Sequence, residues 1–121
     1  GSYYPAGRYY NFFGIGAYDN SPLSGGRKMA VIQGWSTPRN AILGAAKWVS
    51  NNYVLGSWSQ DSLYKMKWNV FQAANENTVW HQYATGRTWA TGIANVMSDC
   101  YRFIGLEMAT SGLLFDVPQY R

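Results

Sequence analysis

The sequence predicts a single α+β domain of 121 residues that is mainly helical and has a short extended region. Two segments, 38–53 and 89–104, repeat apolar residues at spacings of three and four, the period of an amphipathic helix. A third segment, 63–69, alternates in part between apolar and polar residues, which favours a strand. Because 47% of the residues are hydrophobic, the chain can bury one core.

The N-terminal quarter of the chain predicts loops and short strands. Its first 26 residues are rich in glycine, proline, tyrosine, asparagine and serine. Gly1 and Ser2 are expected to be the remnant of an expression tag. Arg27–Gln33 can form two helical turns, which Gly34 is suited to end in the left-handed conformation.

The clearest helix start is Ser36-Thr37-Pro38, where hydroxyl caps precede a proline at the first helical position. The helix should run from about Pro38 to Tyr53. Its expected core stripe comprises Ile42, Ala45, Val49 and Tyr53.

The second half of the chain should contain a loop over 52–62, the strand or extended edge over 63–69, and a polar loop over 72–78. The helix over 89–104 should bury one stripe, and the apolar tail 113–118 should pack back on the domain. Cys100 is the single cysteine, so it forms no intrachain disulfide and is expected to be a small core residue. The expected stripe comprises Trp89, Ile93, Val96, Cys100 and Phe103.

Composition excludes several functional classes. One histidine, one cysteine and six scattered carboxylates give no metal-ligand spacing and disfavour a cysteine–histidine nucleophile. No glycine motif for phosphate is present, and no apolar run approaches the roughly 20 residues of a membrane span. No metal, cofactor or membrane span is therefore expected. The net charge of +4 is scattered, and suits either nucleic acid or an acidic cell wall.

Two segments combine aromatic and polar groups. Ten tyrosines and six tryptophans against five phenylalanines favour flat polar ligands such as sugars, although a core rich in Tyr and Trp would have the same composition. Tyr10–Asp19 has the rings, glycines and carboxylate of a sugar-cleft wall, while Asp19 equally suits an Asx turn. His81–Thr85 offers hydrogen-bond donors to a sugar, or else a structural histidine with Tyr83 in the core.

Carboxylate chemistry on a sugar normally needs two acidic groups, about 5–5.5 Å apart for retention or about 6.5–9.5 Å for inversion. The sequence establishes no apolar surroundings that would raise the pKa of any candidate. Asp19 lies in the aromatic segment, and the other candidates are Asp61, Glu76, Asp99, Glu107 and Asp116.

Seven motifs in order resemble the bacterial cell-wall glucosaminidase domain, the catalytic module of many autolysins of Gram-positive bacteria and their phages. The resemblance covers about Gly7 to Tyr120. The motifs are Tyr10–Asp19, Gly34–Pro38, Ala41–Lys47, Leu63–Asn69, His81–Thr85, Trp89-Ala90 and Phe115–Tyr120.

This resemblance implies a lysozyme-like α+β fold and hydrolysis of the β-1,4 bond after N-acetylglucosamine in peptidoglycan. The partner would be glycan strands and not nucleic acid, and the location secreted or cell-wall associated. The family's general-acid glutamate precedes the first motif, whereas the first glutamate here is Glu76. We therefore expect an incomplete, C-terminal part of the domain with the acid supplied upstream, or a variant lacking the acid. Relatives commonly carry aspartate after the His81–Thr85 motif, where this chain has Gly86-Arg87.

By the same resemblance, Tyr83 lines the cleft beside the scissile bond, and Asp19 is the best remaining carboxylate for polarising water. Phe13 and Tyr18 would form the cleft wall. Trp68 and His81 would border the substrate site as supports for Tyr83. A non-catalytic module that binds cell wall through its aromatic segments is the alternative.

Overall fold

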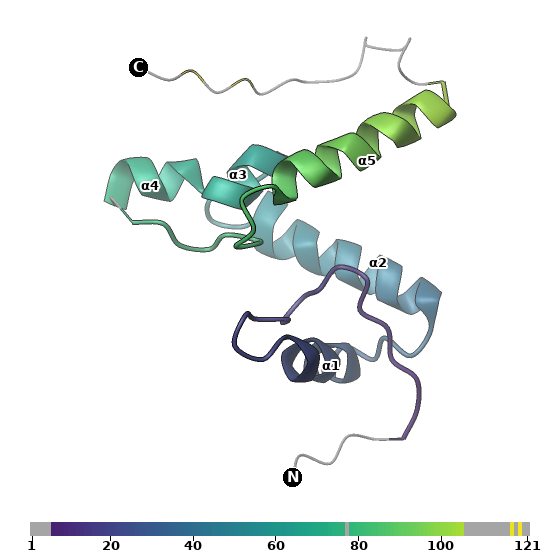
Figure 1. The fold of residues 1–121 in the computed structure, drawn as a ribbon. Helices are drawn as coiled ribbons and strands as arrows, with labels where there is room; N and C mark the ends of the chain where they lie inside the picture. The colour runs from purple at the N-terminus through teal and green to yellow at the C-terminus, as the bar shows by residue number, and fades with distance from the viewer. Residues whose placement is uncertain (1–5, 77, 106–116, 118, 120–121) are drawn as a thin grey trace. The chain divides into compact units, whose positions relative to one another are not determined.

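The computed structural model describes residues 6–76, 78–105, 117 and 119, and the regular secondary structure of these residues is helical (Figure 1). None of them forms a strand, so the expected β-region is absent from the part described. The chain divides into two compact units, residues 1–52 and 53–121. The helices in order are α1 (Pro22–Ile32), α2 (Pro38–Val49), α3 (Leu63–Trp68), α4 (Val70–Glu76) and α5 (Trp89–Phe103), and a π-helical turn, Ser50–Val54, continues α2.

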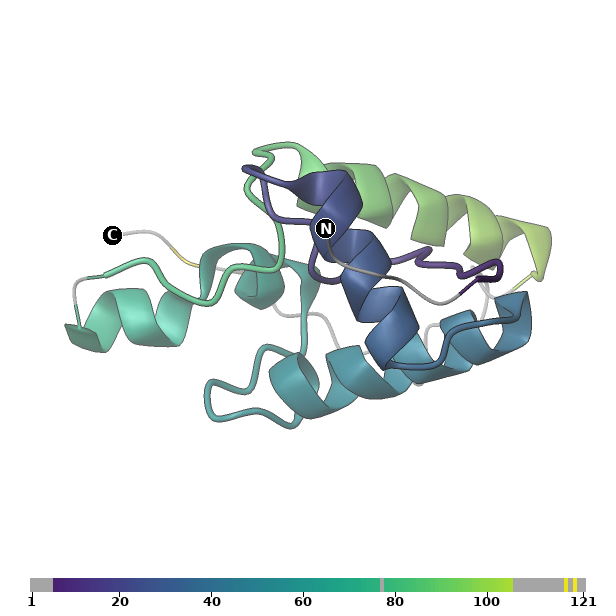
Figure 2. The ribbon, with the colours of Figure 1, turned by 90° about the horizontal axis from the view of Figure 1, so that it is seen from below.

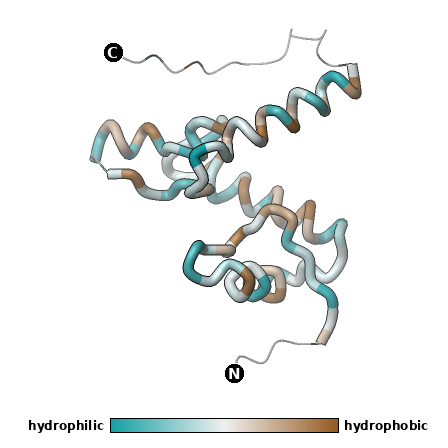
Figure 3. The backbone as a smooth tube through the Cα atoms, in the orientation of Figure 1, coloured by the Kyte–Doolittle hydropathy of each residue, from teal (hydrophilic) through white to brown (hydrophobic). Residues whose placement is uncertain are grey.

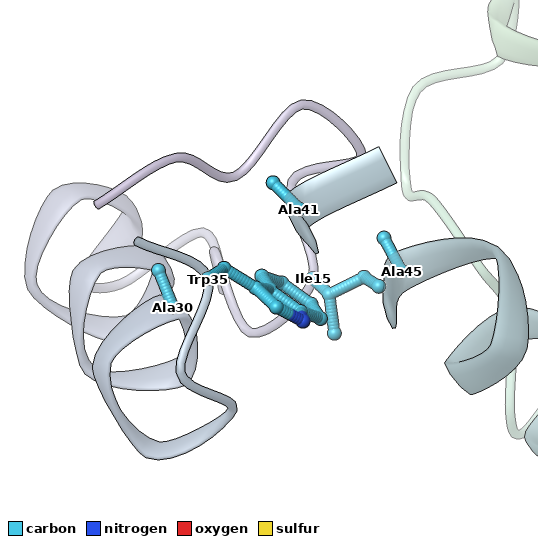
Figure 4. Close-up of a cluster of buried hydrophobic side chains, with 5 residues drawn as sticks. All are labelled: Ile15, Ala30, Trp35, Ala41 and Ala45. Atoms are coloured by element: carbon cyan, nitrogen blue, oxygen red, sulfur yellow. The ribbon is translucent and has the colours of Figure 1, made fainter. Parts of the chain in front are cut away.

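The core of the first unit is built around Trp35, which is only 2% exposed. In Figure 4 its ring reaches from the α1–α2 connection between Ala30 of α1 and the α2 residues Ala41 and Ala45, with Ile15 alongside. The small alanine side chains let the large ring approach both helices closely. The backbone N–H of Trp35 also donates to the carbonyl of Ala30 at 2.9 Å, which fixes the α1–α2 connection.

The helix predicted over Arg27–Gln33 is present but begins earlier, at Pro22. Proline suits a first helical turn because its missing N–H has no partner to lose there. The predicted stop is confirmed, since Gly34 has a φ of +68°. Helix α1 therefore takes in residues that turn-rich composition had assigned to a loop.

Helix α2 begins at the predicted cap, where the hydroxyl of Thr37 accepts the N–H of Asn40 at 3.2 Å. Ala45 and Tyr53 are buried as predicted, but Ile42 is 50% exposed, so its place in the core stripe is wrong. Ala41 is fully buried instead. The reason is the bulk of Trp35, which packs against the face of α2 that carries small side chains.

The strand predicted over 63–69 is wrong, because these residues form α3. The hydroxyl of Ser62 accepts the N–H of Lys65 at 3.3 Å, and Asn69 ends the helix in the left-handed conformation with a φ of +44°. A helix this short has too few turns to display its period, so its partial alternation imitated a strand.

The loop predicted over 72–78 is also wrong, because α4 runs to Glu76 directly after α3 (Figure 2). Two polar side chains of α4 form hydrogen bonds within the helix. The amide of Gln72 donates to the carboxylate of Glu76 at 2.8 Å, and that of Asn75 donates to the carbonyl of Phe71 at 2.7 Å. Both contacts span one turn, and the Gln72–Glu76 pair is of the kind that stabilises helices.

The helix predicted over 89–104 is confirmed as α5, whose hydropathy alternates along its length in Figure 3. Its apolar stripe is not buried by the described residues: Val96 is 60% and Phe103 92% exposed, and Cys100 is exposed as well. The predicted burial of Cys100 is therefore wrong here, because no described side chain covers that face. The tail 113–118 lies outside the described residues apart from Val117. No described helix is long and apolar enough to cross a membrane.

Candidate functional site

Five rings of the second unit form a continuous set of contacts, here named the aromatic cluster. The ring of His81 stacks on Tyr53 with 4.4 Å between centroids and lies 4.7 Å from Trp58. The ring of Tyr83 meets the edge of Tyr53 at 5.2 Å and lies 4.9 Å from Trp89. Aromatic pairs contribute about 0.5–1.5 kcal/mol each beyond burial. The cluster therefore holds Tyr83 between two rings.

Gln60 connects the cluster to the backbone around it. Its side chain is almost fully buried, and its amide nitrogen donates to the carbonyls of Lys65 at 2.9 Å and His81 at 3.0 Å. Its amide oxygen lies 2.7 Å from Nδ1 of His81. Its backbone N–H donates to the carbonyl of Tyr53 at 2.9 Å. The side chain of Gln60 thus joins Lys65 and His81, and its backbone adds Tyr53.

These contacts assign the proton on His81. Carbonyl groups only accept, so the amide nitrogen of Gln60 must face them and its oxygen must face His81. Nδ1 of His81 therefore carries the hydrogen and donates it. Burial lowers the pKa of His81 below its usual 6.5, which favours the neutral ring. Nε2 is then the acceptor nitrogen of the imidazole.

Tyr83 is kept as a neutral phenol. Burial raises its pKa to about 12, and the neighbouring Tyr53 adds to the effect. Its backbone N–H donates to the carbonyl of Met66 at 2.9 Å, which ties it to α3. At neutral pH the hydroxyl can therefore donate a hydrogen bond without ionising.

The end of α3 holds the rest of the segment that carries Tyr83. Lys67 is 2% exposed, and its ammonium donates to the carbonyls of Ala84 at 2.8 Å and Thr85 at 3.1 Å. The amide nitrogen of Asn69 donates to the carbonyl of Trp80 at 2.8 Å. The segment 80–85 is therefore fastened on both sides of Tyr83.

Trp68, predicted to support Tyr83, is 38% exposed. The ammonium of Lys67 lies over its ring, 4.5 Å from the centroid. The ring contacts that the structure describes for Tyr83 are with Tyr53 and Trp89. Trp68 thus contacts Lys67, whose ammonium binds the carbonyls of Ala84 and Thr85 next to Tyr83.

The other predicted site residues, Phe13, Tyr18 and Asp19, belong to the first unit. Phe13 is 40% and Tyr18 71% exposed, and Asp19 is exposed as well. Their segment is shaped by Asn11, whose amide nitrogen donates to the carbonyls of Ile15 at 2.8 Å and Gly26 at 3.0 Å. The structure therefore presents these side chains to solvent on a loop braced against α1.

The same loop and α1 border an open pocket of about 740 Å³. Phe13, Tyr18 and Asp19 are not among its lining residues. Aliphatic and aromatic groups make up most of the lining, with two arginines beside them. The pocket is lined by Gly7, Arg8, Tyr9, Tyr10, Asn11, Gly14, Ala17, Pro22, Leu23, Gly26, Arg27 and Ala30.

Two described carboxylates of the second unit serve local structure. Asp61 pairs with the ammonium of Lys65 at 2.8 Å, and this hydrogen bond lowers the pKa of the carboxyl. Glu76 accepts the amide of Gln72. The lowered pKa of Asp61 is the opposite of the raised pKa that a general acid requires. No group of three potential metal ligands occurs among the described residues.

Sequence reasoning did not select Gln60, Tyr53, Trp58 or Trp89 for the site. The expected helix stripes include Tyr53 and Trp89, and Gln60 falls in the loop predicted over 52–62. A glutamine between serine and aspartate carries no local signal of burial. Only its contacts across the fold single it out.

The comparisons place the chain among known proteins. No family model matches it. It is 45% identical over 114 residues to the bifunctional autolysin of Staphylococcus aureus, an alignment that covers 94% of this chain. The same match covers 8% of the relative, so the chain spans a small part of that protein's length.

Solved structures of S. aureus autolysin E are also similar. One structure superimposes with a TM-score of 0.66 at 41% identity, covering 87% of this chain and 44% of that one. A catalytic mutant in complex with the disaccharide NAG-NAM gives 0.64 at 42% identity, covering 82% and 41%. A complex with the muropeptide NAM-L-Ala-D-iGlu gives 0.65 at 42% identity, covering 84% and 42%. The chain is thus homologous to part of the autolysins, and the resemblance of its motifs to the autolysin-type glucosaminidase domain is confirmed.

Proposed function

We propose that this chain is the C-terminal part of a peptidoglycan hydrolase that cleaves the β-1,4 bond after N-acetylglucosamine. The observation that carries the proposal is the 45% identity to bifunctional autolysin over 94% of the chain. The autolysin E complexes with NAG-NAM and with a muropeptide support glycan strands as the ligand. The proposal includes a lysozyme-like fold with a short β-region in the complete domain, and a secreted or cell-wall location.

Tyr83 is the proposed donor at the reacting sugar. A neutral phenol can hydrogen-bond to an N-acetyl carbonyl or to an oxygen that gains negative charge in the transition state. The pKa of about 12 favours this role, because the hydroxyl stays protonated wherever the enzyme would work. The rings of the aromatic cluster limit the movement of Tyr83, so the donor is held in place before substrate arrives.

The general acid is proposed to come from a glutamate outside these 121 residues. Glycosidic cleavage normally requires two carboxyl groups, and the family resemblance puts one of them before the Tyr10–Asp19 motif. Asp61 and Glu76 are engaged within the second unit. Asp19 is the proposed carboxylate for polarising water, with Phe13 and Tyr18 as cleft wall, and Trp68 and His81 beside the substrate.

The test compares this chain with a version extended upstream through the glutamate helix. Each is incubated with purified peptidoglycan, and new reducing ends are measured. The extended form should release them and the 121-residue chain should release few. Equal activity of the two would contradict an external acid. In the extended form, Tyr83→Phe should lower kcat by about 10²–10³, while Tyr101→Phe on α5 serves as the matched control.

A non-catalytic cell-wall binding module is the second candidate. It is favoured by one observation, namely that Asp61 and Glu76 already have partners within the second unit. Incubation with insoluble peptidoglycan followed by centrifugation separates the two candidates. Retention of the extended form on the pellet without new reducing ends would support binding alone.

A further inference from the structure

We propose that Gln60 is a positioning residue for Tyr83, acting through His81 and Tyr53. This deepens the proposed function and rests on it, because it concerns the phenol assigned there to the reacting sugar. Gln60 lies 1% exposed between the segments that surround Tyr83. Neither the motifs of the sequence nor the relatives' names point to it.

The first support is the backbone of His81, which has a φ of +57°. A left-handed conformation is disfavoured for a residue with a side chain, so surrounding contacts must maintain it. Gln60 binds His81 at two points, through the carbonyl at 3.0 Å and through Nδ1 at 2.7 Å. This two-point contact sets both the backbone and the ring of His81.

The second support is the route from Gln60 to the Tyr83 ring. The His81 ring, once oriented, stacks on Tyr53 at 4.4 Å, and Tyr53 meets the Tyr83 ring at 5.2 Å. The backbone N–H of Gln60 also binds the carbonyl of Tyr53. Gln60 therefore controls the position of Tyr53 from two directions.

The third support is a shared anchor at the end of α3. Gln60 donates to the carbonyl of Lys65, and the next carbonyl, that of Met66, accepts the N–H of Tyr83. The turn that receives Tyr83 is thus bound by Gln60 as well. The ring and the backbone of Tyr83 both depend on this one side chain.

The chemistry requires an amide at position 60. The carbonyls of Lys65 and His81 face a donor at this position, while Nδ1–H of His81 faces an acceptor. A glutamate would keep the shape but lose the donor, and a methionine would lose both. Gln60→Glu and Gln60→Met therefore separate the two halves of the contact.

The direct test is NMR titration of this chain. His81 is its only histidine, so the imidazole signals report one group. Gln60→Glu should raise the His81 pKa from below 6.5 to above it, because a carboxylate then faces Nδ1. Gln60→Met should let Tyr83 titrate nearer 10 than 12 as its ring loosens. Gln33→Glu, an exposed glutamine in the first unit, is the control and should change neither.

A second measurement needs no variant. In the native chain the side-chain amide protons of Gln60 should exchange at least tenfold more slowly than those of Gln33. Equal exchange rates would overturn the proposal even if both Gln60 variants failed to fold.

Kinetics of the extended form complete the test. Gln60→Met should lower kcat at least tenfold and leave KM within about twofold, since positioning acts on the reacting group and not on overall binding. A folded Gln60→Met with unchanged kcat and unchanged Tyr83 titration would refute the role. If the native extended form cleaves nothing while Gln60→Met still lowers the pKa of Tyr83, the proposed function fails and the positioning by Gln60 stands.

Discussion

The indole of Trp35 lies so close to Gly44 of α2 that no side chain can be placed between them. A methyl group built at position 44 would overlap the indole nitrogen and lie 3.0 Å from Cδ1 of Trp35. The core of the first unit therefore depends on the absence of a side chain on that turn of α2.

Gly44→Ala should lower the free energy of unfolding by about 1–3 kcal/mol, because Trp35 is enclosed and cannot move aside without strain. Urea denaturation measures the change. Gly92→Ala is the matched control, since nothing lies within 4 Å of a Cβ added to that glycine of α5. It should raise the stability by about 0.4–1 kcal/mol. An unchanged midpoint for Gly44→Ala would contradict the close packing.

Lys67→Met should loosen the segment that carries Tyr83. The buried ammonium satisfies the carbonyls of Ala84 and Thr85, and its loss should cost about 1–3 kcal/mol. Amide exchange of Tyr83 should also become faster. Lys65→Met removes the surface pair with Asp61 and should cost about 0–1 kcal/mol. Similar losses for the two variants would show that the buried contacts add little.

Acid should destabilise the protein through His81. Its pKa is below 6.5 in the folded state because burial disfavours the charged ring. Between the folded and the unfolded pKa of His81, the unfolded chain binds more protons than the folded one. The contribution of His81 to the free energy of unfolding is therefore present above pH 6.5 and is lost as the pH falls. Urea midpoints from pH 7.5 to 5 measure it. His81→Asn should flatten the dependence over this window, and an unaltered slope would refute the assignment.

Alkali should act through Tyr83. Its folded pKa of about 12 exceeds the ordinary 10.0. The contribution of Tyr83 to the free energy of unfolding is therefore intact below pH 10 and is lost as the pH rises toward 12. The free energy of unfolding should therefore fall over that range, and Tyr83→Phe should fall less. Tyr101→Phe is the control. A native chain and a Tyr83→Phe variant with the same alkaline slope would contradict the raised pKa.

The helix boundaries that were predicted correctly each depend on a local signal. Thr37 and Pro38 start α2, and Gly34 ends α1, because capping involves only neighbouring residues. The errors arose where local signals were weak. Helices α3 and α4 are too short to show their period, and the left-handed Asn69 between them was not recognised as a cap.

The burial of side chains was predicted less well. Ile42 and Cys100 satisfy a helical stripe but are exposed among the described residues, whereas Lys67 and Gln60 are polar and almost fully buried. Periodicity reports which residues share a face and not what covers that face. A buried polar side chain becomes intelligible only when its hydrogen-bond partners are known.

The motifs and the helix boundaries at Gly34 and at Thr37-Pro38 were determined by the sequence alone, because each depends on neighbouring residues. They were sufficient to relate the chain to the autolysin-type glucosaminidase domain. The surroundings of Tyr83 were decided only by the tertiary structure. Tyr53, Gln60 and Trp89 come from separate segments, and their contacts with Tyr83 or with one another exist only once the chain has folded.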